Sequence, residues 1–148
     1  IQLVRKVLDK VDNDLIDPKH GRRVFAERCG SCHRLFGEGT EVGPDLTGSN
    51  RDNLGYLLEN IVDPSRVVPA PMRQSAILLV DGRVITGTIV ARAEKSIEVR
   101  TVKERVSLAT DEVERIKQLD TSLMPEGLLD NLGREDIAAL FAYLQSGF

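Results

Sequence analysis

The sequence predicts a mainly α-helical fold that is interrupted by a small antiparallel β-sheet. Near both ends of the chain, apolar residues recur at intervals of three and four, which is typical of amphipathic helices. The middle instead carries runs of β-branched and aliphatic residues, two of which are joined by Asp81 and Gly82, a pair that favours a hairpin turn. Because helical segments flank the β segment on both sides, we expect an insertion into one helical domain rather than two domains in tandem.

Four segments have the apolar spacing of a helix. Residues 1–17 form the first, and residues 21–35 continue the helical pattern up to a glycine-rich loop. A third helix is expected over about 51–62, where the sequence DPS stops it, and a last one over 133–146. The apolar residues of the first segment are Leu3, Val4, Val7, Leu8, Val11 and Leu15.

The β segment is expected to cover residues 73–118. Apolar positions alternate in its second half, as at Ile97 and Val99, and residues 111–119 add a last strand or turn. Since two or three strands alone are only marginally stable, we expect a small sheet that curls on itself. The pattern resembles the small SH3-like and Sm-like barrels.

Composition and charge limit the classes of function that the chain can have. The 148 residues are 41% hydrophobic and 29% charged, which is typical of a globular chain with one ordinary domain or two small ones. The formal net charge is −3 without a long run of either sign, so we expect no nucleic-acid partner. The longest apolar run, residues 76–80, is far shorter than the ~18 residues of a membrane-spanning helix. Because the first residue is Ile1 rather than Met, we expect a piece of a longer protein.

The chemistry is concentrated in residues 27–36, with the sequence ERCGSCHRLF. This stretch holds both cysteines of the chain, Cys29 and Cys32, and His33 follows directly. Positions i, i+3 and i+4 of a helical turn share a face, so the three side chains can contact one flat group. Two thiols can form thioethers with the two vinyl groups of a heme while the imidazole binds iron, so C-x-x-C-H indicates c-type heme attachment.

Three other interpretations of the motif are possible. A thioredoxin-like dithiol, the main alternative, expects a preceding strand and a βαβ setting, whereas the pattern here is helical. A zinc site needs four ligands and would require His20, whose spacing of nine residues from Cys29 matches no zinc finger. A disulfide between Cys29 and Cys32 would close too small a loop to add much stability.

The sequences GRRVFAERCGSCH, GPDLTG, LMPEGL and IAALFAYL together resemble a class I cytochrome c domain. More closely, the chain from about residue 18 onward resembles the heme-binding domain found at the C-terminus of multidomain dehydrogenase-like proteins. In that family a β segment lies between the third helix and the axial-methionine loop. The resemblance implies an N-terminal amphipathic helix or linker at 1–17, a cytochrome c domain at 18–72 and 119–148, and a β insertion at 73–118.

The resemblance also implies one covalent heme c per chain. Cys29 and Cys32 would bind the heme, and His33 would be the proximal iron ligand. A proximal imidazole needs an acceptor for its other ring nitrogen, and the carbonyl of Pro44 would supply it. Leu46 would pack on the heme face.

Other roles follow from the resemblance alone. Arg51 stands where related cytochromes sometimes place a propionate-binding arginine, with a solvated arginine as the alternative, and Tyr56 would add a hydroxyl donor. Gly21 would let the first and last cytochrome helices approach closely, beside Phe25 and Tyr143. Candidates for the wall of the heme pocket are Phe36, Leu57, Leu58, Ile61 and Leu128.

Three side chains compete for the distal iron position. Met124, in the loop before the last helix, is favoured because class I cytochromes carry their axial methionine there. Met72 is the rival, although a methionine that fills a packing gap is the simpler interpretation. His20 and an open or water-bound site are the remaining alternatives.

These residues predict a one-electron carrier with a His/Met-ligated heme rather than an enzyme. Its partners would be redox proteins or an upstream dehydrogenase domain, and the resemblance places it in the periplasm or cell envelope. The alternative is a heme-based sensor or small-ligand-binding domain with a labile distal ligand. A thiol oxidoreductase would instead keep titratable thiols at Cys29 and Cys32, which covalent heme forbids.

Overall fold

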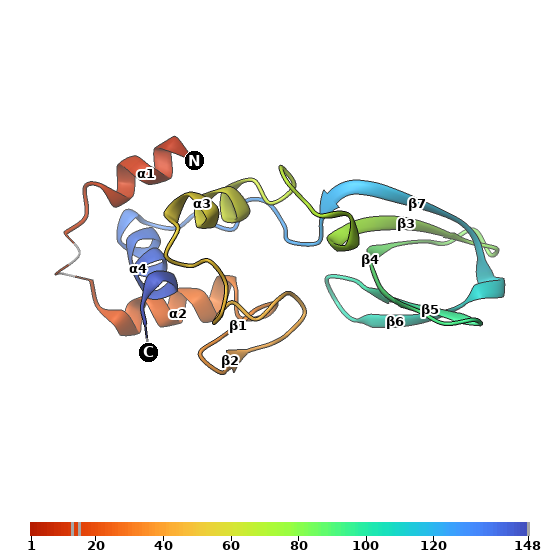
Figure 1. Cartoon of the computed structure of the whole chain (residues 1–148). Coiled ribbons are helices and arrows are strands. Elements are labelled where there is room, and N and C mark those ends of the chain that lie inside the picture. Colours follow the sequence, from red (N-terminus) through yellow and green to blue (C-terminus); the bar gives the residue numbers. More distant parts are fainter. Residues whose placement is uncertain (13, 15, 148) are drawn as a thin grey trace. The chain divides into compact units, whose positions relative to one another are not determined.

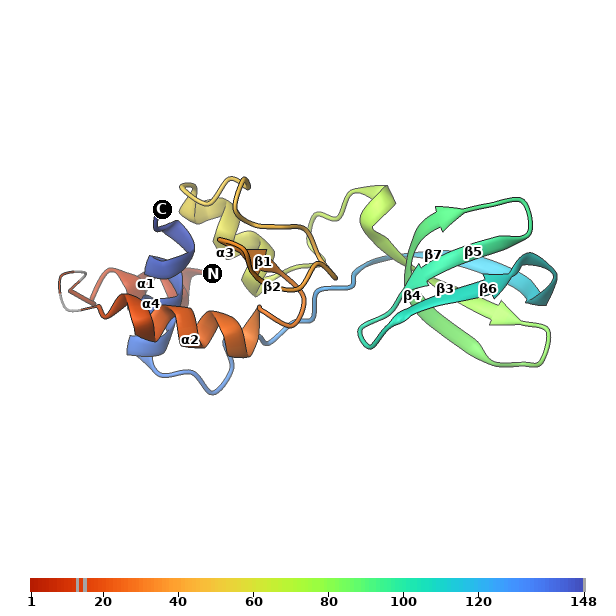
Figure 2. The ribbon, with the colours of Figure 1, turned by 90° about the horizontal axis from the view of Figure 1, so that it is seen from below.

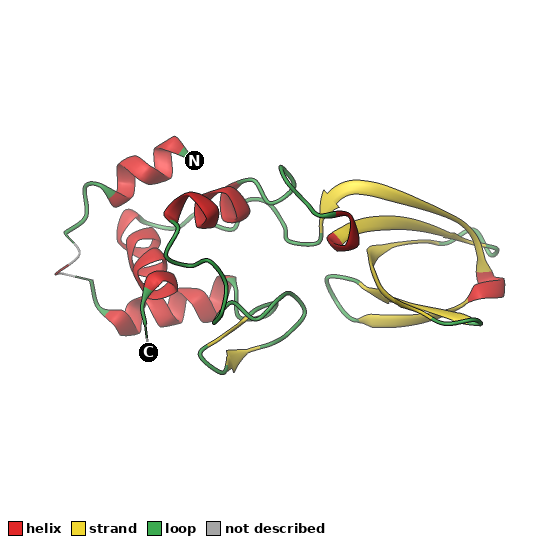
Figure 3. Ribbon diagram, viewed as in Figure 1, coloured by secondary structure: helices red, strands yellow, loops and turns green. Residues whose placement is uncertain are grey.

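The computed structural model describes residues 1–12, 14 and 16–147. Their contacts divide the chain into two compact units: Ile1–Asp63 with Glu126–Phe148, and Pro64–Pro125. Helices and loops build the first unit and a sheet builds the second (Figures 1 and 3). The structure thus combines helices with an antiparallel sheet, as the sequence predicts. That residues 73–118 are an insertion into a cytochrome domain stays a prediction. The contact boundaries lie outside it, at Pro64 and Pro125.

The first unit contains four helices and one short hairpin among the described residues. Two of the helices begin after a residue whose side chain caps them: the Asp17 carboxylate accepts a hydrogen bond from Lys19 N at 2.9 Å, and the Asn53 side chain accepts one from Tyr56 N at 3.1 Å. The elements are α1 (Gln2–Leu8), α2 (Pro18–Arg28), β1 (Arg34–Leu35), β2 (Glu38–Gly39), α3 (Leu54–Val62) and α4 (Arg134–Gln145).

Helices α2 and α4 cross at a glycine. Gly21 is buried, and a Cβ atom there would lie 2.6 Å from the Tyr143 Cβ, too close for any other residue without a shift of the helices. One turn further along α2, the Phe25 ring packs against the Tyr143 ring with centroids 5.7 Å apart. The predicted helix crossing is therefore confirmed.

The second unit is a five-stranded antiparallel sheet in the order β6-β5-β4-β3-β7, and it curls on itself (Figure 2). Its hairpin turn holds Gly82 at φ 90°, and Gly82 N donates to Leu79 O, so the turn predicted at Asp81 and Gly82 is confirmed. Its buried core is Ile77, Leu79, Ile97, Val99 and Leu108. Its elements are η2 (Ala70–Met72), β3 (Arg73–Leu79), β4 (Val84–Arg92), β5 (Ser96–Arg100), β6 (Arg105–Ala109), η3 (Thr110–Glu112) and β7 (Val113–Ser122).

Two helices are shorter than the apolar pattern predicts. α1 ends at Leu8, because the backbone hydrogen bonds after it, from Lys10 N and Val11 N, reach back only three residues. The Asp12 carboxylate then accepts a hydrogen bond from Asp14 N, which closes a local turn. Leu15 lies outside the described residues. The predicted helix at 21–35 ends at Arg28 and is followed by turns and a hairpin. Apolar spacing alone does not detect such local side-chain competition.

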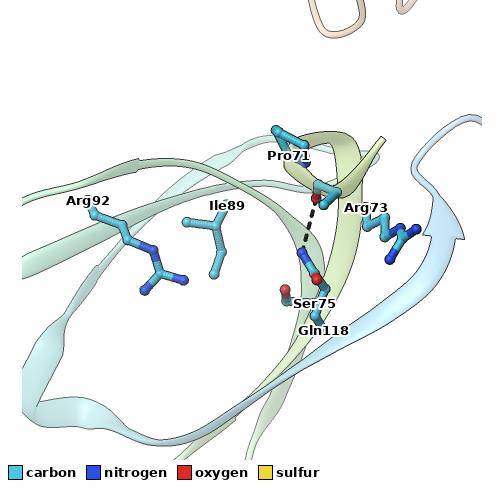
Figure 4. Close-up of a pocket in the computed structure, with 7 residues that line it drawn as sticks. Pro71, Arg73, Ser75, Ile89, Arg92 and Gln118 are labelled. Atoms are coloured by element: carbon cyan, nitrogen blue, oxygen red, sulfur yellow. Dashed lines mark hydrogen bonds between the residues drawn. The ribbon is translucent and has the colours of Figure 1, made fainter. Parts of the chain in front are cut away.

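A pocket of about 270 Å³ lies at the η2 end of the second unit (Figure 4). Gln118 Nε2 donates to Ala70 O at 3.0 Å across it, and Ser75 is buried at its base. The guanidinium of Arg73 is turned away from Arg92, toward Asp120, whose carboxylate is 3.5 Å away. None of the residues predicted to bind heme lines this pocket.

Candidate heme-attachment site

The C-x-x-C-H motif lies at the end of α2 and in the turn that follows it. Cys29 N still donates to Phe25 O at 2.8 Å, as in a helix, and Cys32 N and His33 N both donate to Cys29 O at 3.0 and 2.8 Å. The motif is thus a hydrogen-bonded turn rather than a continuation of the regular helix. Its backbone is fixed by its own hydrogen bonds.

The imidazole of His33 has a defined tautomer. Its Nδ1 lies 2.8 Å from the Pro44 carbonyl oxygen, on a loop 11 residues further along the chain. Because a carbonyl oxygen can only accept, Nδ1 donates its proton to it, and in the neutral ring Nε2 keeps its lone pair. This arrangement presents one ring nitrogen to a metal and holds the other in place.

Gly43 lets the loop lie directly on the imidazole. A Cβ atom at residue 43 would be 2.5 Å from His33 Cε1 and 2.9 Å from Nδ1, and Gly43 N donates to Cys32 O at 2.6 Å. Any side chain there would push either the loop or the ring out of position. Sequence analysis assigned no role to Gly43, although the Gly-Pro pair was the signal that could have identified it.

The two thiols differ in environment. Cys29 is 8% exposed, and burial, followed by the neighbouring Cys32, raises the pKa of its thiol to about 11. Cys32 is half-buried, and both cysteines are free. Because the thiolate is the nucleophile, a raised pKa makes the Cys29 thiol a weak attacking group. Within the described residues no three His, Cys, Asp or Glu side chains group to hold a metal ion, so zinc gains no support.

The remaining predicted heme contacts are placed as follows. Leu46 is half-buried on the loop after Pro44, and Leu46 N donates to Arg34 O at 2.8 Å. Tyr56 is 40% exposed in the first turn of α3. Arg51 is not a solvated residue, because its guanidinium donates to backbone carbonyls of α4 and of its own loop. The roles of Leu46, Tyr56 and Arg51 toward a heme stay predictions.

The three candidates for the distal position lie in different surroundings. His20 Nε2 is 2.7 Å from Asp136 Oδ1, so this ring is paired at the N-terminal ends of α2 and α4. Met124 and Met72 both belong to the second unit; Met124 N donates to Ser122 Oγ at 3.1 Å, and Met72 is 46% exposed. The His20 alternative therefore has a competing partner, while ligation by Met124 stays a prediction.

A helical unit that presents two thiols and an imidazole of fixed tautomer from one turn has the parts for covalent heme attachment. Residues 18–75 match the cytochrome c family model. The match begins at the first residue of α2 and spans the motif, the loop around Gly43 and α3. This part of the chain is thus similar to cytochrome c, a family of heme-based electron carriers with covalently bound heme c. No curated protein matches the chain significantly in sequence.

Proposed function

We propose that the chain is a one-electron carrier with one heme c, bound through Cys29 and Cys32 and ligated by His33 and Met124. The observation that carries this proposal is the hydrogen bond between His33 Nδ1 and Pro44 O, because it makes Nδ1 the donor and leaves Nε2 of the C-x-x-C-H histidine as the nitrogen that can bind iron. When bound, the heme supplies one-electron redox chemistry. This function requires no acid, base or nucleophile from the chain.

Each residue of the site has a separate task in the proposal. Cys29 and Cys32 hold the group through thioethers, so it stays bound in both oxidation states. Pro44 fixes the orientation of the His33 ring and makes it a more basic ligand. Gly43 lets the loop lie close against the imidazole. A thioether of Met124 on the opposite side would raise the reduction potential.

We further propose that the carrier exchanges electrons with redox partner proteins or with an upstream dehydrogenase domain, outside the cytoplasm in the periplasm or cell envelope. The support is the type of heme motif and the resemblance to domains joined to dehydrogenase-like proteins. Among the described residues, none of the helices has the length and apolarity needed to cross a membrane.

A heme-based sensor or ligand-binding domain is the second candidate. It is favoured by one observation: the contacts of Met124 group it with the sheet, whereas His33 belongs to the helical unit. A distal ligand of this kind could be replaced by a small gas. The two candidates therefore differ in whether Met124 stays on the iron in both oxidation states.

Absorption spectra of the purified protein separate these functions. A carrier should show a c-type reduced spectrum that carbon monoxide leaves unchanged, and a weak near-infrared band of methionine bound to ferric heme. Met124→Ala should abolish that band, and the matched variant Met72→Ala should retain it. An immediate shift with carbon monoxide in the unmodified protein would favour the sensor, and a protein without heme would contradict both.

A further inference from the structure

The guanidinium of Arg51 joins separate parts of the first unit. Its Nη1 donates to Leu144 O at 2.6 Å and to Ser146 O at 2.7 Å, at the C-terminal end of α4. Its Nε and Nη2 donate to Thr47 O at 3.2 and 3.1 Å. Its Cζ also lies 4.8 Å from the centroid of the Phe36 ring. All three nitrogens of the side chain are thus engaged with backbone oxygens.

Phe36 needs such support because its backbone is strained. Its φ is 50°, in the left-handed region where bulky residues are uncommon, and Gly37 beside it has φ 81°. The two residues form the tight turn between β1 and β2. The Phe36 ring packs edge-on against Tyr143 of α4, with centroids 5.8 Å apart, and carries the Arg51 cation on its face. Contacts with α4 and Arg51 therefore stabilise the turn.

Thr47 connects this arrangement to the histidine. Its Oγ1 accepts a hydrogen bond from Phe36 N at 2.9 Å, and its carbonyl accepts the two bonds from Arg51. Thr47 lies three residues after Pro44, whose carbonyl oxygen contacts His33 Nδ1. The short segment 44–47 is therefore held at one end by Arg51 and lies against the imidazole at the other.

We propose that Arg51 is a positioning residue for the imidazole of His33. The Arg51 guanidinium donates hydrogen bonds to Thr47 O and to the end of α4, and it lies over the Phe36 ring. These contacts would hold segment 44–47 in place and so keep the Pro44 carbonyl oxygen at His33 Nδ1. This role differs from binding a heme propionate. The inference rests on the proposed function, because it matters for electron transfer only if His33 binds iron.

The reduction potential distinguishes the two roles of Arg51. A hydrogen bond from Nδ1 makes the imidazole more basic and so favours the ferric state. If Arg51 positions Pro44, Arg51→Lys keeps the charge but loses the bidentate fork, and the potential should shift upward. If Arg51 acts through its charge on a propionate, Arg51→Lys should leave the potential nearly unchanged, and Arg51→Gln should lower it.

The experiment measures the reduction potential and the exchange rate of the His33 Nδ1 proton, by NMR in the ferrous state, for the holoprotein and its variants. We expect Arg51→Lys to raise the potential and to speed this proton's exchange at least severalfold. The matched control Arg23→Lys, at an exposed position on α2, should change neither. If Arg51→Lys does not fold, Thr47→Val, which removes the acceptor of Phe36 N and the side-chain hydrogen bond to Asp45, should shift both quantities in the same direction.

Three results would overturn the inference. An unchanged potential and proton exchange in Arg51→Lys, together with a lower potential in Arg51→Gln, would assign Arg51 to the propionate. A lower melting temperature with unchanged potential and proton exchange in both variants would make Arg51 a purely structural residue. Heme-free wild-type protein would remove the proposed function and this inference with it. Either of the first two results, obtained with heme-loaded protein, would remove the inference alone.

Discussion

At the scale of single residues, the geometry of His33 depends on the missing side chain of Gly43 and on the backbone carbonyl of Pro44. Gly43 contributes no side chain, and the imidazole of His33 occupies the place where one would lie. Pro44 contributes only its carbonyl oxygen, and that oxygen fixes the tautomer. The chemistry of the motif is therefore set by backbone geometry eleven residues away, which a motif of five residues does not contain.

Replacing Gly43 by alanine tests this close approach. The new Cβ would be 2.5 Å from His33 Cε1, so Gly43→Ala should lower the free energy of unfolding by about 1–3 kcal/mol and weaken the bond of the histidine to iron. Urea unfolding followed by heme absorbance measures both effects. Gly48→Ala is the matched control, because nothing lies within 4 Å of that position; equal losses in the two variants would contradict the role of Gly43.

At the scale of elements, the crossing of α2 and α4 holds the helical unit together. Gly21 lies against Ala139 and Tyr143 of α4, the Phe25 ring packs on the Tyr143 ring, and His20 and Asp136 join the N-terminal ends of the two helices. Sequence spacing predicted the contacts of Gly21 and Phe25, because residues one turn apart share a helix face. It did not predict the pair of His20 and Asp136, since His20 was a candidate iron ligand.

Gly21→Leu should loosen this crossing before it changes the iron. The added side chain meets α4 backbone and the Tyr143 Cβ, so we expect a loss of about 1–3 kcal/mol or more in unfolding free energy, with the absorption spectrum of the folded protein unchanged. Thermal unfolding measures the loss. An altered iron spectrum in the folded variant would show that the crossing acts on the heme ligands.

The pair of His20 and Asp136 predicts that the stability of the fold depends on pH in the acid range. The hydrogen bond from Gly133 N, and secondly the one with His20, lower the pKa of Asp136 below its ordinary value of 3.8. This group therefore stabilises the fold above pH 3.8, and the contribution is lost as the pH falls through its lowered pKa. Asp136→Asn should reduce stability at neutral pH and flatten the acid side of the stability curve. Glu135→Gln, in the same turn but exposed, should not.

At the scale of the whole molecule, the chain contains two separate cores. The sheet has its own cluster around Ile77, which is fully buried, and the residues of the heme motif lie in the other unit. Ile77→Ala should lower the free energy of unfolding of the second unit by about 2–5 kcal/mol. Amide exchange should then accelerate in β3–β7 and stay unchanged in α2 and α4. Equal acceleration in all helices and strands would show that the two units unfold together.

Sequence patterns and the structure agree where the determinants are local. The hairpin at Gly82 and the existence of the last helix follow from short-range chemistry. The contacts of Arg51 do not, because its partners Leu144 and Ser146 are 93 and 95 residues away. Apolar spacing did not predict the end of α1 at Leu8 for a different reason. Beyond it, the Asp12 carboxylate takes the backbone N–H of Asp14 as its donor.

The mass of the intact, denatured protein tests the central claim most directly. After production in cells that attach heme to C-x-x-C-H motifs, the protein should carry the added mass of one heme, and this heme should resist extraction with acid and organic solvent. The variant Cys29→Ala with Cys32→Ala should lose the added mass. A wild-type chain of unmodified mass, or a heme that extracts freely, would contradict covalent attachment and with it the proposed electron carrier.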